Sequence, residues 1–92
     1  MVKMVNQEVI NQVEKLIDTL NNSSASELYS QEIIIQSEYY GVELNLIQIE
    51  KASFIVNDMI LRLVLPNNRC MDLKLTDKFR IIKKNKIIKD YG

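Results

Sequence analysis

Six basic residues occupy positions 78 to 89 with no acidic residue between them: Lys78, Arg80, Lys83, Lys84, Lys86 and Lys89. Ammonium and guanidinium groups at this density bind anions such as phosphates and carboxylates. An edge strand also uses lysine to prevent pairing with another sheet, so a solvated edge is a second interpretation. Edge protection needs only a few lysines, and the excess predicts an anionic counterpart.

The net charge of zero conceals an uneven distribution of charge along the chain. Residues 1–58 carry three lysines and nine acidic residues, a net charge of −6, whereas residues 59–92 carry nine basic and three acidic residues, a net charge of +6. The pI of about 6.2 and the few aromatic residues near the basic run, Phe79 and Tyr91, argue against nucleic-acid binding by base stacking. The alternative is that the acidic part of the chain faces the basic part, within one molecule or between copies.

Two adjacent tyrosines, Tyr39 and Tyr40, are the second candidate for partner binding. Exposed tyrosines anchor interfaces because they combine a large apolar ring with a polar hydroxyl. The competing interpretation is that one ring packs on the core and the other shields a turn.

The residues needed for catalysis or metal binding are scarce. The chain has no histidine, which removes the commonest general base and metal ligand. The single cysteine, Cys70, precludes an internal disulfide and predicts a reducing compartment such as the cytoplasm. It is expected to be a small hydrophobe at a strand end. Two glycines cannot build a phosphate loop, and no spacing of acids suggests a magnesium site. We therefore expect no enzyme activity, no cofactor and no metal.

The stretch from Ser53 to Leu75 predicts the central strands. Met59–Leu65 is apolar except for Arg62, which is typical of a buried strand and too short for a membrane span. Next, Met71, Leu73 and Leu75 alternate with polar residues, the period of a half-buried strand. Pro66-Asn67-Asn68 predicts the turn that joins the two strands as an antiparallel pair.

The N-terminal segment predicts an amphipathic helix over residues 6–21. Its apolar stripe follows steps of three and four residues: Val5, Val9, Val13, Leu16 and Leu20. Asn6 is the expected N-cap, and Ser24 with Glu27 has the spacing of a capping box for a short second helix. Charged residues within this helix leave no apolar run for a signal peptide.

The remaining strands follow from shorter signals. Ile33-Ile34-Ile35 predicts a strand, and Glu38–Gly41 a hairpin turn in which Gly41 is free to adopt positive φ. A slip in the apolar alternation at Leu46-Ile47 predicts either a bulge or a strand that is covered on both faces. The last hairpin is expected to turn at 83–86, between the apolar segments 79–82 and 87–88.

Together these elements predict one α+β domain over residues 1–92: a helix, then an antiparallel meander of five or six strands over residues 31–90, either open or curved into a small barrel. One helix covers one face of such a sheet poorly, so apolar residues on both faces of the strands predict a homo-oligomer. The expected function is a non-catalytic cytoplasmic interaction or regulatory module that binds a macromolecule, with no membrane contact. The alternatives are a nucleic-acid-binding protein that uses Lys78–Lys89 and, third, a small enzyme or ligand-binding domain.

The segment Leu46–Leu75 resembles the strands of PilZ-type cyclic-dinucleotide-binding domains. This resemblance implies a small β-barrel. The chain lacks that family's paired-arginine motif, and Gln48–Ser53 departs from its Asp/Asn-x-Ser-x-x-Gly motif. The resemblance therefore does not carry the family's ligand over to this chain.

Overall fold

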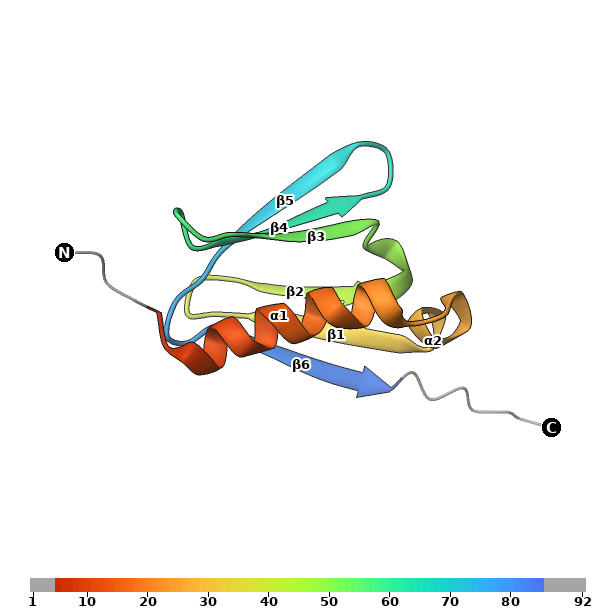
Figure 1. The fold of residues 1–92 in the computed structure, drawn as a ribbon, viewed down its shortest axis with the longest axis horizontal. Coiled ribbons are helices and arrows are strands. Elements are labelled where there is room, and N and C mark those ends of the chain that lie inside the picture. The colour runs from red at the N-terminus through yellow and green to blue at the C-terminus, as the bar shows by residue number, and fades with distance from the viewer. Residues whose placement is uncertain (1–4, 86–92) are drawn as a thin grey trace.

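A computed structural model of the chain describes residues 5–85 (Figure 1). Its elements are, in order, α1 (Gln7–Asn22), α2 (Ala25–Tyr29), β1 (Gln31–Gln36), β2 (Gly41–Asn45), the 3₁₀ turn η1 (Leu46–Gln48), β3 (Lys51–Ile55), β4 (Ile60–Leu65), β5 (Arg69–Lys74) and β6 (Arg80–Asn85). The strands form two three-stranded antiparallel sheets, in the orders β2-β1-β6 and β3-β4-β5. The predicted α+β class is confirmed, and the two sheets are not closed into a barrel.

The N-terminal helix forms where its periodicity predicts it. The Asn6 side chain accepts a 2.9 Å hydrogen bond from the Glu8 backbone N–H and so caps α1. The buried face of α1 consists of Val9, Val13 and Leu16. The capping box that begins α2 is also present, because the Ser24 and Glu27 side chains each accept a hydrogen bond from the other residue's backbone.

The central pair β4–β5 is confirmed with the expected alternation. Arg62 pairs with Asp72 in the register, and Leu63 pairs with Met71. Asn67 and Asn68 reverse the chain with φ of 66° and 60°, which asparagine tolerates better than most residues. The expectation of positive φ at Gly41 is wrong, because the β1–β2 turn closes without it.

The last strand departs most from the expected meander. β6 pairs with β1 instead of folding into a hairpin of its own, with Ile34 opposite Ile82 and Ile35 opposite Ile81. Lys83 and Lys84 therefore lie inside a strand, and the turn predicted there is wrong over the residues that the structure describes. The polar run at 83–86 resembles a turn in the sequence, but an edge strand accommodates lysine readily. The segment 86–90 lies outside the described residues.

The phase slip near Leu46 arises from η1 and not from a bulge. This turn buries Leu46 completely, leaves Ile47 42% exposed, and is followed by the buried Ile49. The alternation therefore changes because the chain leaves β2 and crosses to the second sheet.

A single apolar core lies between the two sheets and α1. The helix packs along β3 of one sheet and β6 of the other, so it closes one side of the space between them (Figure 1). The core contains Val9, Val13, Leu16, Ile33, Ile35, Leu46, Ile49, Leu61, Leu63, Leu73, Leu75 and Phe79. This arrangement leaves the outward faces of both sheets uncovered by any described element.

Candidate functional site

Strand β6 distributes its basic residues over two faces. Because side chains alternate along a strand, Arg80 and Lys84 point outward together with Ile82, whereas Lys83 lies on the same side as Ile81, which packs against the core. The predicted basic run is therefore not one continuous patch. Lys78 is exposed in the loop before β6, and Lys86 and Lys89 lie outside the described residues.

The outward face of the β2-β1-β6 sheet, here called the outer face, combines opposite charges around an apolar centre. Its three cross-strand rows follow from the register: Asn45–Glu32–Lys84, Glu43–Ile34–Ile82 and Gly41–Gln36–Arg80. The acidic residues thus lie on β2 and β1, and the basic residues lie on β6. One edge of this small surface is positive, and the opposite edge and the central strand carry the negative charges.

The apolar centre of the outer face makes no contribution to the core. Ile34 and Ile82 face each other across β1 and β6, and neither belongs to the core or to the apolar residues packed against it. Ile82 is 38% exposed. Ile34 is half-buried, so the two side chains form a partly exposed apolar spot at the centre of a sheet face, a feature that an interface would cover.

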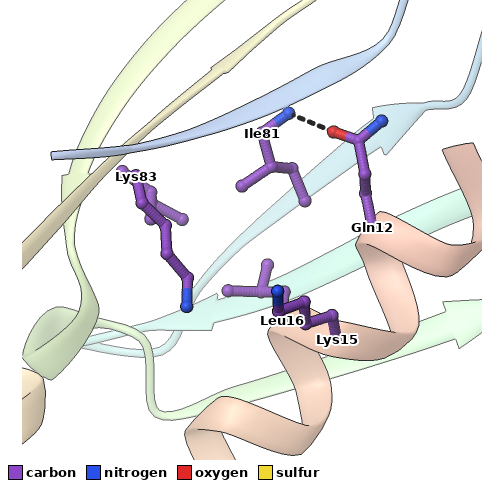
Figure 2. Close-up of a pocket in the computed structure, with 6 residues that line it drawn as sticks. Gln12, Lys15, Leu16, Ile81 and Lys83 are labelled. Carbon is purple, nitrogen blue, oxygen red and sulfur yellow. Dashed lines mark hydrogen bonds between the residues drawn. The ribbon is translucent and has the colours of Figure 1, made fainter.

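The other side of β6 borders a groove against α1, here called the α1–β6 groove (Figure 2). The groove has a volume of about 320 Å³ and is lined by Gln12, Lys15, Leu16, Ile33, Ile81 and Lys83. The Ile81 backbone N–H donates a 2.8 Å hydrogen bond to Oε1 of Gln12. This bond satisfies a donor on the free edge of the strand and holds β6 against the helix.

The two tyrosines differ in their surroundings, and only Tyr40 packs on the core. Tyr40 is partly buried against the core, and its hydroxyl donates a 2.8 Å hydrogen bond to the carbonyl oxygen of Lys74. Tyr39 is 80% exposed. Both tyrosines, together with Met59 and Lys78, line a hollow of about 660 Å³ at one end of the sheets. Met59 has φ of 51°, a backbone conformation that the sequence did not signal.

The outward face of the β3-β4-β5 sheet carries the one ion pair found among residues 5–85. Nε and Nη2 of Arg62 donate hydrogen bonds of 2.8 and 2.9 Å to the two carboxylate oxygens of Asp72. The hydrogen bond from Arg62 holds the pKa of Asp72 below its ordinary value and raises the pKa of Arg62. This pair explains why a single charged residue interrupts the apolar run of β4.

Side chains suited to metal binding do not converge in the part of the chain that the structure describes. No three of its histidine, cysteine, aspartate and glutamate side chains are placed to hold a metal ion. Cys70 is exposed near the start of β5, the strand-end position that was expected. It lies opposite the outward-facing Val64 in the register, on the solvent side of β5. Within residues 5–85, no helix is long and apolar enough to cross a membrane.

The residues that sequence reasoning missed are those on other elements that border β6. Glu32, Ile34 and Glu43 carried no functional signal by themselves, because alternating polar and apolar residues are ordinary in a strand. Gln12 and Lys15 resemble the solvated side of an amphipathic helix.

The fold defines a two-sheet α+β protein with one long helix at the side of the two sheets. No family model, curated protein or solved structure matches the chain.

Proposed function

We propose that this protein is a non-catalytic cytoplasmic interaction module that self-associates through the outer face of the β2-β1-β6 sheet. The observation that carries the proposal is the self-complementary pattern of that face: the half-buried Ile34 beside the exposed Ile82 at the centre, acids on β2 and β1, and bases on β6. The single unpaired cysteine supports a reducing compartment.

A twofold axis parallel to the strands brings opposite charges together. Such an axis lays β2 of one copy over β6 of the other, and β1 over β1. Ile34 then meets Ile34 of the second copy, and Glu43 lies over Ile82 of the second copy, between Arg80 and Lys84. The same axis brings the two copies of Glu32 together, each beside the Lys84 of its own copy. Gly41 contributes no side chain and has open space above it, which leaves room for Arg80 of the second copy.

The size of this face sets the expected affinity. Stable interfaces bury about 1,200–2,000 Å² in total. A face of three strands, each of five or six residues, is small by that measure. We therefore expect a weak dimer with a dissociation constant in the micromolar range.

Nucleic-acid binding is the second candidate function, and it rests on the bases of β6. Glu32 and Glu43 share the outer face with Arg80 and Lys84, so they repel phosphates that approach this surface. Binding to DNA or RNA that weakens steeply with salt would favour this candidate over self-association.

Light scattering coupled to size exclusion tests self-association, with the protein loaded at high micromolar concentration. We expect a dimeric mass for the wild type and a monomeric mass for Ile82→Glu, which places a charge in the apolar centre. Val56→Glu is the matched control, because Val56 is 60% exposed in the β3–β4 turn, away from the outer face. A monomeric wild type, or a dimer that only Val56→Glu disrupts, would refute the proposal.

A further inference from the structure

The α1–β6 groove combines an apolar floor with two cations at its mouth. Leu16 and Ile33 belong to the floor and are almost fully buried, so the groove reaches down to the core. Lys15 and Lys83 come from different elements, and their side chains extend toward each other across the gap (Figure 2). The volume of about 320 Å³ lies at the lower end of the range of small-molecule sites, about 300–1,000 Å³.

The two lysines have no anionic partner of their own among the described residues. The ion pair between Arg62 and Asp72 is the only one formed there. Asp18, one turn along the helix from Lys15, instead accepts a 2.6 Å hydrogen bond from the Asn22 side chain. An anion placed between two ammonium groups is attracted by both of them.

We propose that the α1–β6 groove binds a small anionic amphiphile, a molecule with one carboxylate and an aliphatic tail. The tail lies on Leu16, Ile33 and Ile81, and the carboxylate lies between the ammonium groups of Lys15 and Lys83. The apolar floor selects for the tail through burial of aliphatic surface, and the lysines select for the negative head. This site is on the opposite side of β6 from the outer face, so it is independent of self-association.

An NMR titration of the isotope-labelled full chain with octanoate tests the site. We expect the backbone amide signals of Ile81 and Lys83 to shift in a saturable manner at millimolar octanoate. Acetate, which has the carboxylate without the tail, should bind far more weakly, and so should octan-1-ol, which has the tail without the charge. The shifts should persist in Ile82→Glu, because that change is on the other face.

A double variant distinguishes octanoate binding in the groove from nonspecific binding of octanoate elsewhere on the protein. Lys15→Gln with Lys83→Gln keeps the length of both side chains and should weaken octanoate binding about tenfold or more. The control is Lys51→Gln with Lys74→Gln, two exposed lysines of the other sheet, which should leave the affinity unchanged. No octanoate shifts, equal binding of acetate, or equal affinity in both double variants would overturn the proposal.

Discussion

The hydroxyl of Tyr40 donates a hydrogen bond of 2.8 Å to the carbonyl oxygen of Lys74, and this bond joins the two sheets. Tyr40 belongs to the turn between β1 and β2, whereas Lys74 is the last residue of β5. Burial raises the pKa of Tyr40 above its ordinary value of 10.0. The neighbouring Tyr39 projects into solvent, so the two tyrosines form a natural matched pair for mutation.

Tyr40→Phe should destabilise the protein by about 1 kcal/mol, because the ring stays in place while the bond to the Lys74 carbonyl is lost. Tyr39→Phe should change the free energy of unfolding by much less. Urea denaturation followed by circular dichroism measures both variants. Equal stabilities for the two would show that the bond between the sheets has no energetic role.

The raised pKa of Tyr40 also predicts an alkaline effect. The folded state favours the neutral phenol, so this contribution to stability is complete below the unfolded pKa near 10.0 and is lost as pH rises through the folded pKa. Unfolding curves from pH 8 upward should therefore show a steeper loss of stability for the wild type than for Tyr40→Phe. Parallel curves would contradict the assignment.

Leu63→Asp should destabilise the protein by several kcal/mol, because Leu63 is fully buried and the new carboxylate would have no partner. Lys74→Asp, on the exposed side of the adjacent strand β5, should cost little. Thermal melts of the two variants measure the difference. Similar melting temperatures would place β4 outside the core and contradict the structure.

The pair formed by Arg62 and Asp72 predicts a small effect in acid. Because Arg62 depresses the folded pKa of Asp72, the contribution is present above the unfolded pKa near 3.8 and disappears as pH falls through the folded value. Both groups are exposed to solvent, so added salt should weaken the effect. Asp72→Asn should remove it, as unfolding curves between pH 2 and 6 would reveal. An unchanged pH profile in Asp72→Asn would rule out this role for the pair.

Charge reversal on the outer face tests the geometry of the proposed dimer. Glu43→Arg and Arg80→Glu should each weaken self-association severalfold, because each places like charges opposite one another. The double variant exchanges the charges and should recover part of the affinity. Sedimentation equilibrium provides the dissociation constants. Additive losses in the double variant would exclude the proposed twofold arrangement even if the protein is a dimer.

The sequence alone determined those elements whose signals are local. Asn6 and the stripe formed by Val9, Val13 and Leu16 specify α1, because a cap and a helical period both act within a few residues. The alternation that buries Leu73 and the turn at Asn67-Asn68 likewise specify the β4–β5 pair. The absence of histidine is a matter of composition, and by itself it lowers the expectation of acid–base catalysis.

Only the tertiary structure decided which surfaces β6 forms. Ile81 hydrogen-bonds to Gln12, which is 69 positions away, and β6 pairs with β1 rather than with β5. A run of isoleucine and lysine is compatible with several partner strands, and the choice among them depends on packing that involves the whole core. The basic residues of β6 could be counted in the sequence. Their separation into an outer face with Glu43 and a groove with Lys15 could not be predicted from the sequence, because it depends on which strand β6 pairs with.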